Sequence, residues 1–136
     1  MICIEKQILG WYYLYMLKRF IVFLCLVIAS SVFAGELENA LKQNKNVFLY
    51  FYTPDCWYCK KFSTNYTKLS QTYDKQYKFI KFDASTPYGY NLFKKYKGKY
   101  VPYIVLINSK NNAAQVDPNC LVNTVCAEKA LTKFIK

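Results

Sequence analysis

The feature that most constrains this chain is a buried-strand pattern that leads directly into a pair of cysteines. The apolar and aromatic run Val47–Tyr52 is followed, after three turn-forming residues, by a Cys-X-X-Cys motif at residues 56–59. An unbroken apolar run of this length is typical of a strand that is buried on both faces of its sheet. The next segment, 57–73, predicts a helix, because its apolar residues recur at spacings of three and four: Phe62, Tyr66, Leu69 and Tyr73.

The rest of the chain continues this alternation of strands and helices. Further helices are predicted at 36–43, 90–96 and 128–135, strands at 77–82 and 103–107, a short edge strand at 113–116, and connecting segments at 83–87 and 108–112. Strands that alternate with helices argue for a sheet covered on both faces. We therefore predict the α/β class, with a central mixed β-sheet flanked by helices.

Length and composition exclude several kinds of protein. A chain of 136 residues allows one domain. It has no histidine, which excludes a Ser-His-Asp triad and a histidine-ligated zinc site. The formal charge of +11 comes from 18 Lys and one Arg. Because the lysines are scattered and base readout favours the planar fork of Arg, we expect no nucleic acid partner.

The N-terminal third is predicted to be a targeting segment. Phe20–Ala34 is a run of 15 residues without a charge, preceded by a basic pair and ended by small residues. This run is shorter than the roughly 20 residues that span a bilayer, and it matches the apolar core of a signal peptide. We expect residues 1–34 to be a signal peptide that is cleaved after Ala34, with Met16 as an alternative start. The competing interpretation is an uncleaved membrane anchor.

Both interpretations place residues 35–136 outside the cytosol, as a periplasmic or secreted domain or as an anchored one. This part has 102 residues, and its 16 Lys and 7 acidic residues give a net charge of +9. It keeps four cysteines, Cys56, Cys59, Cys120 and Cys126. An even number of cysteines in a small exported domain favours disulfide bonds.

The position of the Cys-X-X-Cys motif predicts redox chemistry. Cys56 falls near a helix N-terminus, where unpaired N–H groups and the helix dipole stabilise a thiolate, and Cys59 lies one turn further along. Such a pair attacks a disulfide with the outer sulfur and resolves the mixed disulfide with the inner one. A plain structural bridge is an alternative, although so short a loop gains little from closure. A zinc site that includes Cys120 and Cys126 is another, although their spacing suits zinc poorly.

With its strand-CWYC-helix unit and with Val101-Pro102 before a strand, 43 residues after Cys59, the sequence resembles the thioredoxin family. The resemblance covers about residues 47–116 and extends over 36–136. It implies a thioredoxin-like fold and the activity of an exported thiol-disulfide oxidoreductase. It also implies that Pro102 is cis and packs beside the disulfide, and that Val101 offers main-chain hydrogen bonds to a bound peptide.

One departure from the family concerns the position six residues before the first active-site cysteine. Thioredoxins carry a buried acidic residue there, which helps to deprotonate the resolving thiol, whereas this chain has Tyr50. The dipeptide between the cysteines, Trp57-Tyr58, also differs from the family consensus. We therefore expect a redox poise different from that of a cytosolic thioredoxin.

Three aromatic residues and the second cysteine pair complete the predicted site. We expect Trp57, Tyr58 and Tyr103 to border the active-site groove and to hold an extended peptide. Cys120 and Cys126 are expected to form a structural disulfide before the last helix. The alternative is a second redox pair that passes electrons to the first one.

The sequence thus predicts a protein-disulfide oxidoreductase with Cys56 as nucleophile and Cys59 as resolving thiol. We expect neither a metal nor an organic cofactor, because the dithiol itself carries the electrons. The expected partners are cysteine-containing client proteins and a redox partner protein, for which a membrane-bound protein is one candidate. We expect the protein itself to be a monomer. The alternative function is a non-catalytic binding or assembly module with a structural disulfide. Whether the pair oxidises, reduces or isomerises stays open at this stage.

Overall fold

The structure, a computed structural model, describes residues 15–19, 35–121 and 123–135, and it divides the chain into two units, Met1–Glu36 and Leu37–Lys136. In the first unit, residues 15–19 are helical. The rest of the predicted signal peptide, its cleavage point and the anchor alternative lie outside the described residues, so they stay predictions. Among the helices that the structure describes, none has the length and hydropathy needed to cross a membrane.

The second unit contains alternating strands and helices. A helix at residues 35–42 leads into it. The elements that follow are β1 (Val47–Tyr52), α2 (Trp57–Thr72), β2 (Lys78–Asp83), α3 (Pro87–Lys95), β3 (Tyr103–Ile107), β4 (Ala113–Gln115), the short 3-10 helix η1 (Pro118–Leu121) and α4 (Thr124–Ile135).

The four strands form one mixed sheet in the order β2-β1-β3-β4. β1 and β2 run parallel, with Val47 opposite Lys78, and β1 and β3 run antiparallel, with Val47 opposite Ile107. β4 pairs antiparallel with β3 at the edge. The predicted mixed sheet is therefore confirmed, and its central strand is the one that leads into the cysteine motif.

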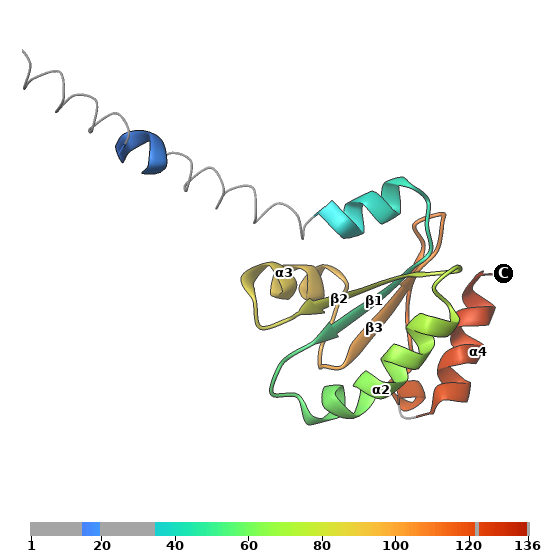
Figure 1. The fold of residues 1–136 in the computed structure, drawn as a ribbon. Coiled ribbons are helices and arrows are strands. Elements are labelled where there is room, and N and C mark those ends of the chain that lie inside the picture. Colours follow the sequence, from blue (N-terminus) through green and yellow to red (C-terminus); the bar gives the residue numbers. More distant parts are fainter. Residues whose placement is uncertain (1–14, 20–34, 122, 136) are drawn as a thin grey trace, which may run out of the picture. The chain divides into compact units, whose positions relative to one another are not determined.

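The sheet has a hydrophobic cluster on each face, because successive side chains of a strand point to opposite sides. Val47, Leu49 and Phe51 of β1 belong to one cluster, together with buried residues of the helix at 35–42 and of α3. Phe48 and Tyr50 belong to the other, together with residues of α2 and α4. In Figure 1, α3 lies on one side of the sheet and α2 with α4 on the other.

Two helices begin earlier than the apolar periodicity predicts, since capping residues fix their first turns. α3 begins at Pro87 rather than at residue 90: the Thr86 side chain accepts a hydrogen bond from the Gly89 N–H at 3.1 Å, and Pro87 occupies the first helical position. α4 begins at Thr124 rather than at residue 128. There the Asn123 side chain accepts hydrogen bonds from two N–H groups of the first turn.

Candidate active site

Cys56 occupies the cap position at the N-terminus of α2. Its backbone is extended, with φ −71° and ψ 109°, and its Sγ accepts a hydrogen bond from the main-chain N–H of Cys59 at 3.1 Å. The two cysteines form a disulfide with a Cα–Cα distance of 5.2 Å. The strand-loop-helix order of the sequence thus places one sulfur where the first N–H groups of a helix have no partner within the helix.

The two sulfurs of this pair differ in exposure. Cys56 is half-buried, whereas Cys59 is 5% exposed and belongs to the core beneath α2. An incoming disulfide therefore meets Cys56 first. Cys59 is placed to attack Cys56 from inside once a mixed disulfide has formed, and this is the division of roles that thiol-disulfide exchange requires.

Tyr50 lies beneath the inner cysteine, on β1. Its hydroxyl donates a long hydrogen bond, 3.5 Å, to the main-chain oxygen of Cys59, and its ring contacts those of Phe62 and Tyr66. Burial, with smaller contributions from Tyr52 and Tyr66, raises the pKa of Tyr50 from 10.0 to about 12. The phenol therefore stays protonated at neutral pH, and it positions the first turn of α2 without acting as a base.

A cavity of about 360 Å³ reaches Cys59 from the side of α2 that faces β1 and β2. Tyr50, Tyr52 and Lys81 line it together with Cys59. The Nζ of Lys81 lies 5.8 Å from the centre of the Tyr52 ring. Among the described residues that line this cavity there is no carboxylate.

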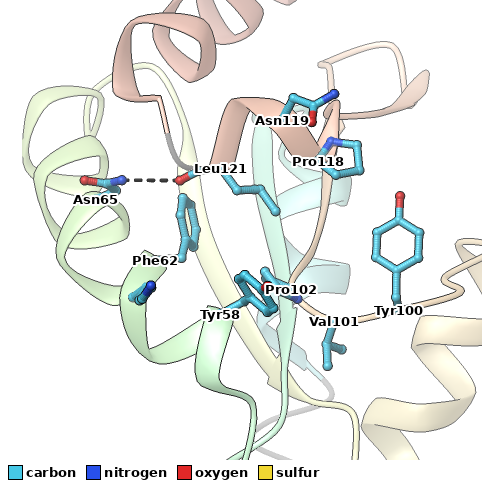
Figure 2. Close-up of a pocket in the computed structure, with 10 residues that line it drawn as sticks. Tyr58, Phe62, Asn65, Tyr100, Val101, Pro102, Pro118, Asn119 and Leu121 are labelled. Atoms are coloured by element: carbon cyan, nitrogen blue, oxygen red, sulfur yellow. Dashed lines mark hydrogen bonds between the residues drawn. The ribbon is translucent and has the colours of Figure 1, made fainter.

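A larger groove, of about 580 Å³, runs along another face of α2. Figure 2 shows it between α2, the segment before β3, and η1. α2 lines the groove with Tyr58, Lys61, Phe62 and Asn65. The opposite walls come from Tyr100, Val101 and Pro102, and from Pro118, Asn119 and Leu121 of η1. Among the lining residues, Tyr58 stands between the two cysteines in the sequence, and neither cysteine is part of the lining.

The segment before β3 supplies the residues that the thioredoxin resemblance singles out. The Val101–Pro102 peptide bond is cis. Both residues line the groove, with Pro102 buried and Val101 half-buried. Within the described residues, neither the main-chain N–H nor the C=O of Val101 has a hydrogen-bond partner. Those two groups are therefore available to a ligand in the groove.

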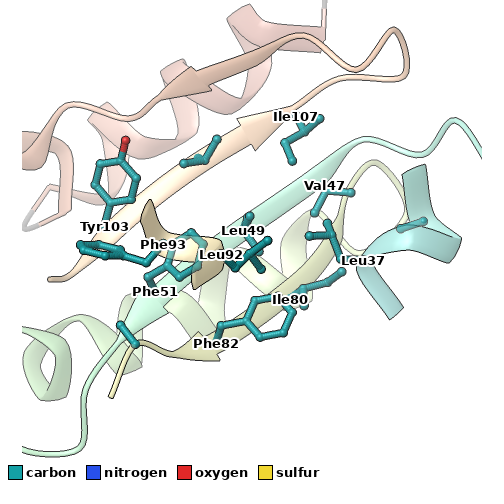
Figure 3. Close-up of a cluster of buried hydrophobic side chains, with 13 residues drawn as sticks. Leu37, Val47, Leu49, Phe51, Ile80, Phe82, Leu92, Phe93, Tyr103 and Ile107 are labelled. Carbon is teal, nitrogen blue, oxygen red and sulfur yellow. The ribbon is translucent and has the colours of Figure 1, made fainter. Parts of the chain in front are cut away.

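The three aromatic residues that we expected at the groove lie in three different places. Tyr58 lines the groove. Trp57 does not line it and is 63% exposed at the helix terminus, with Lys61 Nζ 5.1 Å from its ring centre. Tyr103 does not line it, so that expectation was wrong. The β3 alternation turns Tyr103 to the α3 face, where it is buried and where Figure 3 shows it beside Phe93.

The second pair, Cys120 and Cys126, forms the disulfide that the sequence predicts. Its Cα–Cα distance is 4.8 Å, and it joins η1 to the first turn of α4. Each cysteine is thus bonded to the other member of its own pair, an arrangement that differs from a zinc site shared by all four cysteines. The bridge also stands next to Leu121, which is a wall residue of the groove.

Several groove residues were missed by the sequence reasoning. Tyr58, Lys61, Phe62 and Asn65 have the spacing i, i+3, i+4 and i+7 of one helix face, so the face was visible in the sequence once Tyr58 was chosen. Tyr100, which takes the place expected for Tyr103, lies three residues before β3, in the segment that carries the cis Val101–Pro102 bond. The contribution of η1 had no such signal, since it depends on how distant segments pack.

The site joins a half-exposed cysteine at a helix N-terminus to a buried partner and an adjoining groove, on a mixed sheet with helices on both faces. These features define a thioredoxin-type redox protein, and the comparisons agree. A family profile described as Thioredoxin matches residues 27–132. A search of curated protein sequences gives no significant match.

Solved structures of thioredoxins share the fold. Mitochondrial thioredoxin 3 of Saccharomyces cerevisiae, in its oxidised form, has a TM-score of 0.61 and 25% identity, over 74% of this chain and 89% of the yeast chain. Deadhead, a germline-specific thioredoxin of Drosophila melanogaster, has a TM-score of 0.62 and 20% identity, over 75% and 90%. Oxidised thioredoxin of Plasmodium falciparum has a TM-score of 0.59 and 20% identity, over 75% and 92%.

The chain belongs to the thioredoxin family, because the profile covers well over half of it. With Cys56 and Cys59 joined as a disulfide at the N-terminus of α2, it is a thiol-disulfide oxidoreductase. The predicted fold class and enzyme class are thereby confirmed, and they favour catalysis over the non-catalytic binding module.

Proposed function

We propose that this oxidoreductase acts on disulfides of client proteins outside the cytosol, with Cys56 as the attacking nucleophile and Cys59 as the resolving thiol. The observation that carries the proposal is the cap position of Cys56, whose half-buried sulfur accepts the Cys59 N–H at 3.1 Å. In the reduced protein this hydrogen bond is made to a thiolate, and hydrogen bonds to charged groups are the stronger ones.

In the reducing direction, the Cys56 thiolate attacks one sulfur of the client disulfide. A bond forms between Cys56 and that sulfur, the client disulfide breaks, and the released client thiolate takes up a proton. Cys59 then gives its proton to water and attacks the Cys56 sulfur. The second client thiolate leaves, the Cys56–Cys59 disulfide forms, and two electrons have passed to the client. The oxidising direction is the reverse of these steps.

The client segment is proposed to bind in extended form across Val101 and Pro102. The unpartnered main-chain groups of Val101 support this, because an extended segment can pair with them as it would with a strand. Tyr58 and Trp57, both strongly exposed beside the cysteines, offer it aromatic contact surface. No metal or organic cofactor enters these steps.

The location outside the cytosol is supported by the sequence of residues 1–34 and by the two disulfides of the described domain. Disulfides persist in oxidising compartments. The test is the N-terminal mass of the protein recovered from fractionated source cells. A chain that begins at Gly35 in the periplasm or medium supports the proposal, an intact chain in the membrane fraction supports the anchor, and recovery in the cytosol contradicts both.

The catalytic roles are tested by trapping. The Cys59→Ser variant of the full chain is expected to accumulate mixed disulfides with client proteins, which migrate as reducible adducts and are identified by mass spectrometry. The matched Cys56→Ser variant keeps the inner cysteine and should trap nothing. Adducts of equal yield on both variants would show that Cys56 is not the nucleophile.

A redox partner must restore the dithiol or the disulfide after each cycle, and its type depends on the direction of electron flow. The reduction potential of the Cys56–Cys59 pair, measured against glutathione, gives this direction. A value well above that of thioredoxin, about −270 mV, indicates disulfide formation, and a value near or below it indicates reduction. Gel filtration checks the proposed monomer.

A further inference from the structure

A basic surface lies at the C-terminal end of α3, outside the residues that build the dithiol site. Residues 84–116 contain five lysines and no acidic residue. Four of these lysines stand at the end of α3 and in the segment after it, and all four are exposed: Lys94, Lys95, Lys97 and Lys99. Within the described residues, none of the four forms an ion pair with a carboxylate. We call these four residues the lysine surface.

The structure gathers three of the four lysines around one cavity. Lys95, Lys97 and Lys99 line a cavity of about 470 Å³ at the β4 edge of the sheet, and no carboxylate is among its described lining residues. Its other walls come from the residue after α3 and from β3 and β4: Tyr96, Tyr103, Val105, Ala113 and Gln115. Ammonium groups that share a cavity repel one another, and an anion placed among them relieves this repulsion. The cavity therefore suits a phosphate group.

Exposed aromatic side chains accompany the lysine surface. Tyr90 is 51% exposed, and the Nζ of Lys94, one helical turn later, lies 6.0 Å from the centre of its ring. Tyr88 and Tyr100 are also exposed, before and after the lysines in the chain. Lysine together with tyrosine suits a layer of lipid headgroups, because the tyrosine ring has an apolar body and a polar tip. Nucleic acid recognition favours arginine, and residues 35–136 contain none.

One member of the lysine surface stands where the backbone favours glycine. Lys97 has a φ of 61°, in the left-handed region. Its N–H donates to the main-chain oxygen of Lys94, and the N–H of Gly98 donates to that of Phe93, both at 2.9 Å, which is the Schellman pattern of helix ends. The other two described non-glycine residues with a positive φ are asparagines, which tolerate this region. A lysine there costs stability, and this cost favours a functional use of its charge.

The chain enters the domain on the side of the sheet that carries α3. Leu37, in the helix at 35–42, is buried in one cluster with Leu92 and Phe93 of α3. The uncharged apolar run at 20–34 precedes this helix. An apolar segment that enters a membrane, before cleavage or as an anchor, therefore joins the domain on the side of the lysine surface. The entry helix carries two glutamates, so the proposed contact is the lysine surface and not the whole α3 side.

We propose that the lysine surface, with Tyr90, docks the domain on an anionic lipid membrane. The phosphate of one headgroup occupies the cavity between Lys95, Lys97 and Lys99. Each lysine close to an anionic leaflet strengthens binding by about fivefold, and this effect reaches only about one Debye length. The preceding apolar segment favours a lipid surface over a soluble anion. The inference goes beyond the proposed function, because it concerns where the domain is held and uses neither cysteine pair.

The test measures how fast each lysine reacts with a membrane-impermeant acetylating reagent, as read by mass spectrometry. The full chain is added to preformed vesicles of phosphatidylcholine, either alone or with about one third phosphatidylglycerol. Because the apolar N-terminal segment can enter both kinds of vesicle, the comparison isolates the effect of lipid charge. The lysine surface should react about fivefold or more slowly on the anionic vesicles. Lys129 and Lys133, on α4 at the other side of the sheet in Figure 1, should change by less than about twofold.

Two variants of equal net charge locate the contact. One removes the charge of the lysine surface by Lys94→Gln, Lys95→Gln, Lys97→Gln and Lys99→Gln. The matched control changes four exposed lysines on α2, on the turn after it and on α4, by Lys68→Gln, Lys75→Gln, Lys129→Gln and Lys133→Gln. On anionic vesicles, iodination of Tyr90 should be slowed in the control variant and not in the first one, since loss of four lysines weakens docking by about tenfold or more. Circular dichroism checks that both variants fold.

The Lys97→Gly variant separates docking from stability. Glycine suits a φ of 61°, so the thermal midpoint should stay the same or rise, while the protection of the other three lysines falls by about two- to fivefold. A lower midpoint with unchanged protection would show that Lys97 serves the fold alone, against the proposal.

The docking proposal is overturned by equal acetylation rates on both kinds of vesicle, or by loss of Tyr90 protection in the control variant. Equal shielding of the same lysines by a short duplex DNA, or by glycerol phosphate at the same phosphate concentration, would also overturn it, because the partner would then be a soluble anion. These measurements do not involve Cys56. Their failure would leave the proposed function intact, since the trapping of mixed disulfides decides that function separately.

Discussion

The reactivity of Cys56 should depend on one main-chain N–H, that of Cys59. The Cys59→Pro substitution removes this donor, while Cys59→Ala keeps it, and both remove the resolving thiol. Proline is tolerated in the first turn of a helix, where the N–H has no partner within the helix. The pair of variants therefore isolates the hydrogen bond of 3.1 Å to the Cys56 sulfur.

The expected magnitude follows from the charge on the acceptor. A hydrogen bond to a charged group contributes about 1.5–3 kcal/mol and one to a neutral group about 0.5–1.5 kcal/mol, so this bond favours thiolate over thiol by about 1–1.5 kcal/mol. At 1.36 kcal/mol per tenfold change, the thiolate-to-thiol ratio of the Ala variant is roughly five- to twelvefold higher. The helix dipole acts on both variants and cancels.

The assay is alkylation by iodoacetamide between pH 5 and 10, followed by mass spectrometry of the peptide that carries Cys56. The Ala variant should reach half of its maximal rate about 0.7–1.1 pH units below the Pro variant, and below the roughly 8.5 of a free cysteine. Circular dichroism checks that both variants fold. Coincident midpoints in two folded variants would refute the argument that the cap hydrogen bond activates Cys56.

Three further predictions concern the aromatic core and α4. Burial raises the pKa of Tyr50 and of Tyr77 from 10.0 to about 12. The stabilisation that these two buried phenols give the folded state is therefore complete below pH 10 and falls as the pH rises toward 12. In thermal melts, a Tyr77→Phe variant should lose less stability than the unchanged protein between pH 10 and about 12. A Tyr50→Phe variant should keep the shape of the pH–rate profile between pH 6 and 9, because the phenol stays protonated over that range. If the variant lost a sloping limb of the profile that the unchanged protein shows, this prediction would be contradicted. Leu131 is 1% exposed, so Leu131→Ala should cost about 2–5 kcal/mol in urea unfolding, against less than about 0.5 kcal/mol for Ile135→Ala at the exposed end of α4.

The centre of the sheet could be predicted from the sequence because its two middle strands, β1 and β3, are buried on both faces. A strand such as β1 must be apolar throughout, and this pattern leaves few alternatives. The helix starts were harder to predict, because apolar periodicity marks the buried face of a helix and not its first turn. The caps were nonetheless present in the sequence, as Thr86 before Pro87 and as Asn123 before α4.

Some parts of the active site could likewise be predicted from the sequence, and others could not. The cysteine pair and its position on a helix N-terminus follow from local sequence, and so does the placement of Tyr58. Tyr103 was misplaced because its closeness to Pro102 in the chain was given more weight than the alternation of side chains along β3. The groove wall could not be predicted, since Asn65 and Leu121 lie 56 residues apart and meet only when α4 and η1 pack against α2.

The surroundings of the dithiol bear on the direction of electron flow. Whatever stabilises the Cys56 thiolate stabilises the reduced protein relative to the disulfide and raises the reduction potential. The helix N-terminus and the Cys59 N–H both act in this sense, and the groove beside them carries Lys61. Beneath Cys59, the neutral hydroxyl of Tyr50 occupies a place where a carboxylate would oppose the thiolate by like-charge repulsion. These contributions have the same sign, and we expect each of them to raise the reduction potential of the Cys56–Cys59 pair.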